Sequence, residues 1–294
     1  MDVKKVGVAG LGLMGHGITQ VAAQAGYEVV AREVDDATLQ KGIGKIEKQF
    51  ARAVEKGKLE QSAADEIRGR ISTTTGFDGF EDCDLVIEAI TESLPAKLEL
   101  WAELDKTVKE GAVFATNTSS LSVIDQAAST SRPHRFIGLH FFNPAQVMPL
   151  LEVVQTVTTD EDALKTGFEF GERCKKLTVH AKDKTGFIVN RLLVPYMLDA
   201  IRAYEEGVGT VDQIDEAMKG GAAHPMGPFT LLDFVGLDTT KSIADIMFDE
   251  YREKRFAAPP TLRKMVAAGF YGRKSGKGFY DYSGDKPVVT ELGL

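Results

Sequence analysis

The glycine pattern near the N-terminus constrains the fold of this chain most. In "VKKVGVAGLGLMGHGITQVAAQAGYEVV", three glycines form a G-x-G-x-x-G frame between a strand-like run and an amphipathic helical run. The first glycine of such a frame permits a tight turn, the second lets a ligand approach the backbone, and the third lets helix and strand pack closely. The frame predicts a strand–turn–helix unit that binds a dinucleotide pyrophosphate through Gly10, Leu11, Gly12, Leu13, Met14 and Gly15.

The first half of the chain alternates strand-like runs with helical patterns, which favours a mostly parallel sheet with crossover helices. A Lys-, Glu- and Ala-rich insert at residues 36–70 indicates a helical pair that protrudes from this sheet. The expected strands are residues 6–9, 28–31, 85–89, 113–116, 135–139, 151–154 and 177–180. We therefore expect an α/β fold with an N-terminal Rossmann-type doubly wound sheet.

Helical periodicity replaces this alternation from Phe187 onward, with no strand expected until "GKGFYDY" near the C-terminus. Pro228 marks a helix start, because proline is favoured at the first helical position. The boundary between the two patterns falls at residues 182–186. We expect a dinucleotide-binding domain over residues 1–184 and an all-α domain for substrate binding and dimerisation over residues 185–294.

The charge and cysteine content exclude several classes of protein. The 294 residues carry a net charge of −8, whereas a nucleic-acid binder needs a basic face to neutralise phosphates. Cys83 and Cys174 lack the spacing of a metal or redox motif, and no apolar run approaches the ~20 residues of a membrane span. The N-terminus also lacks the apolar stretch of a signal peptide. We expect a cytoplasmic protein without a metal site and without nucleic-acid or membrane partners.

Arg32 and Glu33, at the end of the second expected strand, bear on the choice of nucleotide. A carboxylate at this position accepts hydrogen bonds from the adenosine ribose hydroxyls and favours NAD. The neighbouring guanidinium of Arg32 could instead hold the 2′-phosphate of NADP. We expect NAD as the cofactor, with NADP as the alternative.

The histidine in "GLHFFNPAQVMPLLEVV" is the main candidate for proton transfer. His140 follows a strand-like run, and Glu152 begins the next one after a turn that contains Asn143 and two prolines. The turn can bring the two side chains together, and a carboxylate bonded to one imidazole nitrogen raises the basicity of the other. The pair suits removal of a proton from an alcohol, although a histidine between apolar residues is equally compatible with a structural role in the core.

The run "ATNTSSLSV" follows another expected strand and puts Asn117, Ser119 and Ser120 at the same edge of the sheet. These side chains could orient a substrate hydroxyl or carbonyl. Equally, they could cap the next helix, which is a common role of serine and asparagine.

Seven blocks, in order along nearly the whole chain, resemble the short-chain L-3-hydroxyacyl-CoA dehydrogenase family, and most of all its bacterial 3-hydroxybutyryl-CoA dehydrogenases. The blocks are "GLGLMGHGI", "DLVIEAITE", "ATNTSSLS", "GLHFFNPAQVMPLLEVV", "DKTGFIVNRLLVPYMLDA", "HPMGPFTLLDFVGLD" and "GRKSGKGFYDY". The resemblance implies interconversion of an L-3-hydroxyacyl-CoA, favouring 3-hydroxybutyryl-CoA, and a 3-oxoacyl-CoA with NAD(H). It also implies a homodimer through the helical half of the chain.

The resemblance further implies roles for individual residues. His140 is the implied catalytic base and Glu152 its partner, while Ser119 and Asn190 would contact the hydroxyl and carbonyl of the acyl group. For the cofactor it implies, besides the glycine loop, Glu33, Glu92, Lys97, Asn117, Ser119, Asn143 and Lys274. Many relatives carry Asp in place of Glu33, which keeps the carboxylate but changes its reach.

Arg52 and Lys56 in "EKQFARAVEKGK" lie four residues apart and so share a helix face. The resemblance puts this face beside the CoA part of an acyl-CoA thioester, whose phosphates would attract both cations. The alternative is a solvated helix with ion pairs to Glu55 or Glu60.

Two other functions fit parts of the sequence. A related dehydrogenase of a free hydroxy acid or sugar acid would share the nucleotide-binding fold. A non-catalytic dinucleotide sensor would share the glycine loop, but it would not need His140, Glu152 and Ser119 together.

Overall fold

A computed structural model describes residues 1–292 and divides the chain into two compact units, Met1–Lys184 and Thr185–Leu294. Each unit has its own buried apolar core. No helix within the described residues is long and apolar enough to cross a membrane.

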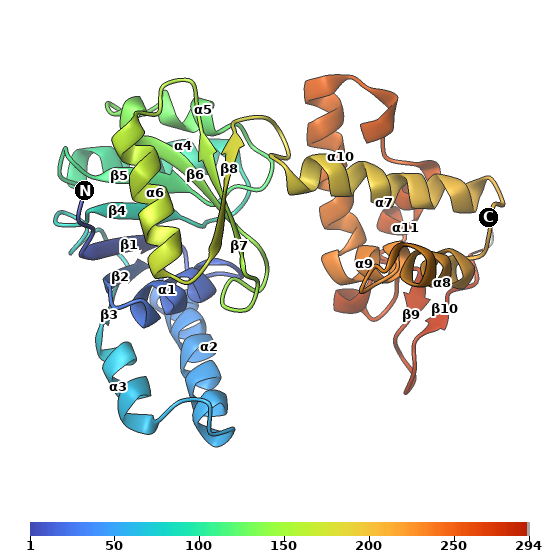
Figure 1. The fold of residues 1–294 in the computed structure, drawn as a ribbon, viewed down its shortest axis with the longest axis horizontal. Helices are drawn as coiled ribbons and strands as arrows, with labels where there is room; N and C mark the ends of the chain where they lie inside the picture. The colour runs from blue at the N-terminus through green and yellow to red at the C-terminus, as the bar shows by residue number, and fades with distance from the viewer. Residues whose placement is uncertain (293–294) are drawn as a thin grey trace. The chain divides into compact units, whose positions relative to one another are not determined.

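The first unit is built on one sheet with the strand order β3-β2-β1-β4-β5-β6-β7-β8 (Figure 1). Neighbouring strands run parallel except β6 and β7, which pair antiparallel. The order from β3 to β6 is that of the Rossmann fold and confirms the predicted doubly wound sheet. The strands are β1 Lys5–Ala9, β2 Glu28–Arg32, β3 Ile71–Thr74, β4 Leu85–Glu88, β5 Val113–Thr116, β6 Phe136–Phe141, β7 Leu150–Gln155 and β8 Leu177–Lys182.

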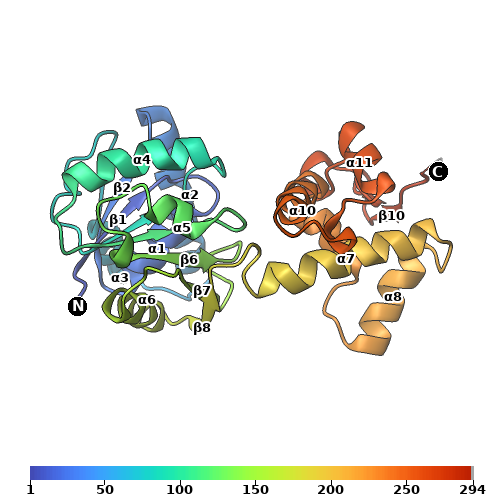
Figure 2. The same ribbon diagram turned by 90° about the horizontal axis from the view of Figure 1, so that it is seen from above.

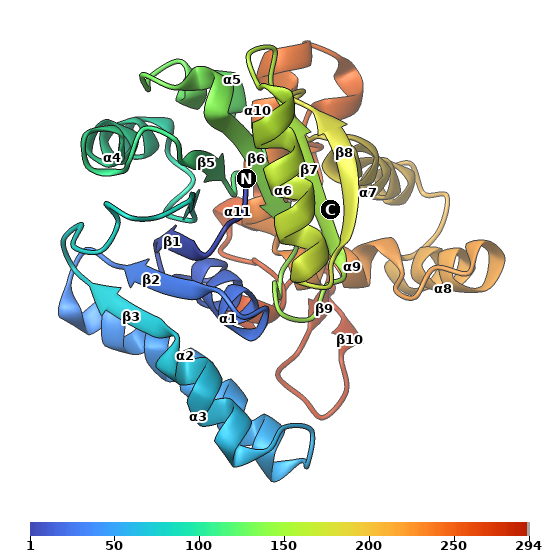
Figure 3. The same cartoon turned by 60° about the vertical axis from the view of Figure 1, so that its left-hand side comes forward.

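Helices cover both faces of this sheet (Figure 3). One apolar core joins the sheet to α1, α2, α3 and α6, and on the other face Trp101 of α4 stacks on Phe114 of β5 with ring centroids 5.1 Å apart. These layers give the parallel strands the burial on both faces that they require. The helices are α1 Gly15–Gln24, α2 Asp36–Glu55, α3 Gln61–Gly69, α4 Leu94–Thr107, α5 Val123–Ala127 and α6 Glu161–Arg173, with a short 3₁₀ turn at Pro133–Arg135.

The predicted helical insert is confirmed, but one strand was missed after it. α2 and α3 form the expected pair, and β3 follows them as an edge strand on β2. Its four residues, "ISTT", have an apolar side chain only at Ile71, and Ser72 and Thr73 are exposed. A short edge strand with one buried side chain leaves almost no hydrophobic pattern in the sequence.

The second unit is helical (Figure 2), with a small hairpin near its end (Figure 1). The helix start predicted at Pro228 is confirmed, since α9 begins at that residue. The elements are α7 Val189–Glu205, α8 Val211–Ala222, α9 Pro228–Val235, α10 Leu237–Tyr251, α11 Pro260–Ala267, 3₁₀ turns at Lys254–Phe256 and Arg273–Ser275, β9 Tyr280–Asp281 and β10 Val288–Val289. The strand expected in "GKGFYDY" is therefore β9, which pairs antiparallel with β10.

Two buried carboxylates attach the hairpin to the helices. Asp233 accepts hydrogen bonds from the amides of Phe279 and Tyr280, at 2.9 and 2.8 Å. Asp215 accepts from the Phe229 amide at 2.7 Å and from the Tyr280 hydroxyl at 2.9 Å. Burial raises the pKa of Asp233, and the bonds from the two backbone amides and the Tyr282 hydroxyl oppose this rise. Asp215 and Asp233 thus hold the hairpin against the helices, and Phe279 beside it belongs to the apolar core of this unit.

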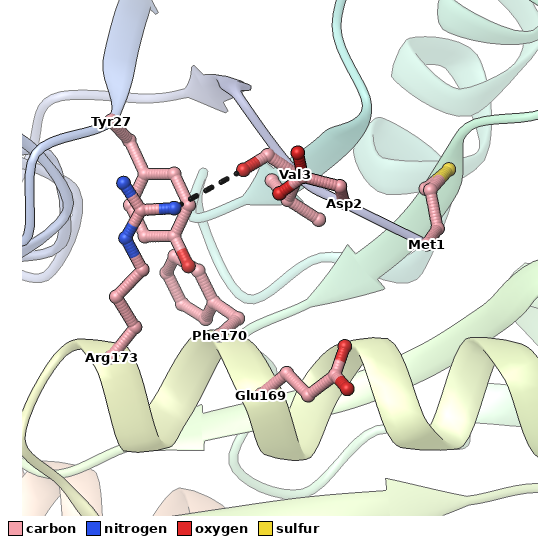
Figure 4. Close-up of a pocket in the computed structure, with 7 residues that line it drawn as sticks. All are labelled: Met1, Asp2, Val3, Tyr27, Glu169, Phe170 and Arg173. Atoms are coloured by element: carbon pink, nitrogen blue, oxygen red, sulfur yellow. Dashed lines mark hydrogen bonds between the residues drawn. The ribbon is translucent and has the colours of Figure 1, made fainter.

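A shallow pocket at the amino end of β1 and β2 contains a structural arginine (Figure 4). Arg173, at the end of α6, donates to the backbone oxygens of Ala25, Gly26 and Val3 at 3.0, 3.3 and 3.4 Å. Its guanidinium also lies over the Tyr27 ring, 4.1 Å from the centroid. Strands β1 and β2 are parallel, so this pocket and the glycine loop lie at opposite ends of β1.

Arg173→Met should therefore lower stability and leave catalysis unchanged. Loss of the carbonyl contacts and the cation–π contact predicts a loss of about 1–2 kcal/mol in the free energy of unfolding. Thermal unfolding should show a fall in Tm of a few degrees, while Glu172→Ala, an exposed neighbour, should unfold as wild type does. An unchanged Tm for Arg173→Met would contradict the anchoring role.

Candidate active site

The glycine loop between β1 and α1 has the geometry that its spacing predicts. Gly10 has a φ of +101°, a left-handed conformation that other residues rarely adopt. A Cβ on Gly15 would lie 1.8 Å from the Gly10 carbonyl oxygen, so only glycine fits there. A Cβ on Gly12 would meet no heavy atom within 4 Å, which leaves one side of the loop open.

This loop fits the pyrophosphate of a dinucleotide. In the described part of the chain, the amides of Gly12, Leu13 and Met14 donate to no acceptor of the protein. The first turn of α1 contains no acidic side chain and its N-cap makes no side-chain bond. Unpaired amides at a helix N-terminus are a general site for phosphate groups, so the residues present fit the phosphates of NAD.

The two charged residues at the end of β2 point to different partners. Glu33 accepts from the Leu11 amide at 2.7 Å and from the Val34 amide at 3.1 Å, so its carboxylate lies against the glycine loop. Arg32 donates through Nε to the Gly76 oxygen at 3.0 Å, and its guanidinium lies 4.5 Å from the centroid of the Phe77 ring. The carboxylate, rather than the guanidinium, is thus held by the nucleotide-binding loop.

His140 and Glu152 form a buried hydrogen-bonded pair. They are register partners in the β6–β7 ladder, and His140 Nδ1 lies 2.6 Å from Glu152 Oε2. Their exposed fractions are 5% and 0%. Because a carboxylate only accepts, Nδ1 donates, and Nε2 is the nitrogen that can take a proton.

The predicted association of the two side chains is confirmed, but the predicted positions in the strands were wrong. His140 lies inside β6 rather than after it, and Glu152 is the third residue of β7 rather than its first. The two strands pair antiparallel across the turn that contains Pro144 and Pro149, so the ladder sets the two residues opposite each other. Buried strands are usually apolar, so the sequence pattern places a polar residue such as His140 or Glu152 at a strand end.

Asn117 and Phe142 make contacts next to the pair. Asn117 Oδ1 accepts from the Phe141 amide at 3.0 Å and so joins the end of β5 to the end of β6. The Phe142 ring packs on the His140 imidazole with centroids 4.5 Å apart. The first contact fixes the backbone next to His140, and the second restricts the orientation of the imidazole ring.

Glu92 organises the segment after Asn117. Its Oε1 accepts from the Thr118 hydroxyl at 2.6 Å and from the Ser119 amide and hydroxyl at 2.8 and 3.2 Å. The Ser120 hydroxyl adds a longer contact of 3.4 Å. Burial alone would raise the pKa of Glu92, but the Lys97 ammonium and the bonds from Thr118 and Ser119 outweigh burial and lower it.

The capping alternative for this segment is wrong. Helix α5 is capped by Ser122, whose side chain accepts from the Asp125 amide at 3.2 Å. The carboxylate of Asp183 accepts from the first two amides of α5, at 3.2 and 2.7 Å. Ser119 and Ser120 bond to Glu92 instead.

Lys97 lies beneath this network and is fully buried. Its ammonium donates to Glu88 Oε1 at 2.6 Å and lies 3.3 Å from Glu92 Oε2. Glu88 also accepts from the Thr116 hydroxyl at 2.7 Å. Glu88 was not predicted as part of the site, although an acidic residue within the apolar run "DLVIEAI" indicates a buried charge with a partner.

The other predicted site residues are found in both units. Asn143 is exposed in the β6–β7 turn, and Arg52 and Lys56 are exposed at the end of α2, without an ion pair to any described residue. In the second unit, Asn190 is the second residue of α7, and Lys274 bonds to Asp238 at 2.7 Å. Within residues 1–292, no group of three or more His, Cys, Asp or Glu side chains is placed to hold a metal ion.

The Rossmann sheet and the open glycine loop define a dinucleotide-binding protein, and its first unit also contains a buried histidine–carboxylate pair. The chain belongs to the 3-hydroxyacyl-CoA dehydrogenase family. The model of the family's NAD-binding domain matches residues 5–184, and that of its C-terminal domain matches residues 186–282. The chain is thus an enzyme of this family with NAD as its cofactor.

Relatives match over nearly the whole chain. A 3-hydroxybutyryl-CoA dehydrogenase of Mycobacterium tuberculosis is 47% identical over 95% of this chain and 99% of its own. The mitochondrial hydroxyacyl-coenzyme A dehydrogenase of Homo sapiens is 46% identical over 95% of this chain and 91% of its own. The crystal structure of (S)-3-hydroxybutyryl-CoA dehydrogenase PaaH1 from Ralstonia eutropha has a TM-score of 0.93 at 37% identity, over 96% of this chain and 100% of that one.

Proposed function

We propose that this enzyme interconverts L-3-hydroxybutyryl-CoA and acetoacetyl-CoA with NAD(H), with His140 and Glu152 as its acid–base pair. The buried 2.6 Å contact between His140 Nδ1 and Glu152 Oε2 carries the proposal. The full-length similarity to 3-hydroxybutyryl-CoA dehydrogenases supports the choice of substrate. A free hydroxy acid or a sensor function has no comparable support in the chain.

Proton transfer at the substrate's 3-hydroxyl is assigned to His140. When bound, NAD supplies the hydride acceptor for C3 in oxidation, and NADH supplies the donor in reduction. In oxidation, His140 Nε2 accepts the hydroxyl proton, and Glu152 stabilises the resulting imidazolium without accepting a proton itself. In reduction, the imidazolium donates the same proton to the oxygen of the ketone.

Ser119 is the proposed contact for the substrate oxygen, and Glu92 positions it. The amide and the hydroxyl of Ser119 both bond to Glu92 Oε1, which supports a fixed orientation for this side chain. Lys97 is 1% exposed and forms ion pairs with Glu88 and Glu92. We therefore propose that Lys97 acts on the cofactor through Glu92 and does not touch the cofactor itself. Asn117, Asn143, Asn190 and Lys274 remain predicted cofactor or substrate contacts.

NAD is the proposed nucleotide in preference to NADP. Glu33 faces the glycine loop, where its charge would repel a 2′-phosphate. Arg32 is engaged by Gly76 and Phe77, which supports the same choice. Parallel initial rates with NADH and NADPH test it, and equal kcat/KM values for the two would contradict it.

The CoA phosphates are assigned to the exposed end of α2. Arg52→Ala combined with Lys56→Ala should raise the KM for acetoacetyl-CoA about tenfold at low salt, because two phosphate contacts are lost. The difference from wild type should shrink as salt is added. Lys106→Ala, an exposed residue of α4, is the control and should change nothing. An unchanged KM in the double variant would favour the solvated-helix alternative.

An assay with acetoacetyl-CoA and NADH, followed by NADH absorbance, tests the proposed reaction. Oxidation of NADH that depends on acetoacetyl-CoA, and not on free acetoacetate, is the expected result. Substrates from four to sixteen carbons would then define the chain-length preference. A higher kcat/KM for free hydroxy or oxo acids would overturn the assignment in favour of the alternative dehydrogenase.

We also propose a cytoplasmic homodimer that forms through the helical unit. Most apolar side chains of α7 and α9 fill that unit's own core, but Leu192 is 65% exposed and Phe234 is 47% exposed. Exposed apolar side chains such as these would be buried if two helical units formed an interface. The buried free thiols of Cys83 and Cys174 suit a reducing compartment. Light scattering after size exclusion measures the mass directly, and a monomer would contradict the dimer.

A further inference from the structure

His16 is a buried histidine that the reaction does not use. It is the second residue of α1, and it is only 8% exposed. Its Nδ1 lies 2.7 Å from the carbonyl oxygen of Gly12, the open glycine of the loop. Its Nε2 lies 3.4 Å from Nε2 of Gln49 on α2.

These two partners select one form of the imidazole. A carbonyl oxygen only accepts, so Nδ1 must carry the hydrogen, and the amide nitrogen of Gln49 only donates, so Nε2 must accept. The neutral ring with its hydrogen on Nδ1 satisfies both contacts. Burial lowers the pKa of His16 and the Lys45 ammonium adds to this, while the bond to Gly12 opposes them, so the neutral form is favoured.

The bond from His16 fixes the orientation of the Gly12–Leu13 peptide. This peptide is trans, because the cis bond among the described residues is Asn143–Pro144. In a trans peptide the C=O and the following N–H point in opposite directions. With the Gly12 oxygen bonded to His16, the Leu13 N–H points away from the His16 ring, and it donates to no acceptor among the described residues.

We propose that His16 is a positioning residue for NAD, which orients the Leu13 amide toward the pyrophosphate, and that Gln49 holds His16 in that role. Glycine has more backbone freedom than any other residue, so a loop built on Gly10 and Gly12 gains most from such an anchor. The link makes α2 part of the nucleotide site. Close packing supports this, since a Cβ on Gly42 of α2 would lie 2.6 Å from Leu11 Cβ.

A matched pair of variants tests the anchor. His16→Leu keeps an apolar side chain without the donor, whereas His16→Asn places an amide N–H near the position of Nδ1. Fluorescence titration of the apo-protein with NADH should give a Kd about fivefold higher for His16→Leu, equivalent to about 1 kcal/mol. His16→Asn should stay within about twofold of wild type. Equal Kd values for His16→Leu and wild type, or equal losses in both variants, would overturn the proposal.

A double-mutant cycle tests the part played by Gln49. Gln49→Leu should raise the Kd for NADH about twofold in the wild-type background and have no effect in the His16→Leu background. Additive effects would mean that Gln49 does not act through His16. At saturating NADH, the kcat of His16→Leu and that of Gln49→Leu should both equal the wild-type value. A fall in Tm and kcat at constant Kd would identify His16 as merely structural.

Discussion

Replacing His140 by alanine should reduce kcat by about 10²- to 10⁴-fold, the usual contribution of a positioned general acid–base. The loss should be similar in both directions, because the same nitrogen accepts the proton in oxidation and returns it in reduction. Single-turnover absorbance measurements with acetoacetyl-CoA and NADH give the rate of the chemical step. The Kd for NADH should remain within about twofold of wild type, since the glycine loop and Glu33 are unchanged.

Folding must be separated from chemistry in this experiment. His140→Ala leaves the carboxylate of Glu152 buried without its imidazole, which costs stability. His140→Asn is the better variant for this purpose, because its amide N–H lies near the position of Nδ1 and can still donate to Glu152. Both variants should lose turnover, whereas only the alanine variant should show a clearly lower Tm. Near-normal turnover in a folded His140→Asn protein would remove His140 from the proposed role.

The glycine loop and the general architecture could be predicted because they depend on local sequence. The loop conformation is set by residues that lack a Cβ, and a sequence displays these directly. Most parallel strands of this sheet are buried on both faces, so they appear as apolar runs such as residues 85–87 and 113–115. Strand β3 escaped prediction because only one of its four side chains is buried.

The polar network of the site could be predicted only in part. His140 and Glu152 are joined by one tight connection, so a turn between two strands was enough to suggest that they meet. The bonds of Glu92 to Ser119 and of Asn117 to Phe141 join residues far apart in the chain, and nothing local specifies them. Glu88 and Lys97 pair across the start of α4. Residue type alone suggests a surface position for both, and only the apolar run around Glu88 indicates a buried charge.

The orientation of Arg32 and Glu33 shows the same limit at the nucleotide site. Both residue types are visible in the sequence, and each alone would favour a different nucleotide. Their partners decide the question, because Gly76 and Phe77 hold the guanidinium while Leu11 and Val34 bind the carboxylate. Those partners include the loop after β3, the strand that the sequence did not reveal.

Replacing Glu152 by glutamine should lower kcat by about 10²-fold and change its dependence on pH. The amide oxygen can still accept from His140 Nδ1, so the ring keeps its orientation, but the negative charge that stabilises the imidazolium is lost. Ketone reduction needs that imidazolium as its proton donor, so the rate of reduction should begin to fall at a lower pH than in the wild-type enzyme. Measuring kcat from pH 5 to 10 with saturating NADH and acetoacetyl-CoA tests this.

Glu152→Asp separates charge from geometry in the same experiment. It keeps the carboxylate but shortens its reach to a ring only 2.6 Å away in the native pair. The aspartate variant should therefore lose turnover with little change in the shape of its pH profile, whereas the glutamine variant should change both. If the glutamine variant kept the wild-type pH profile, the carboxylate would not be acting on the charge of His140, and Glu152 would serve only to hold the ring in place.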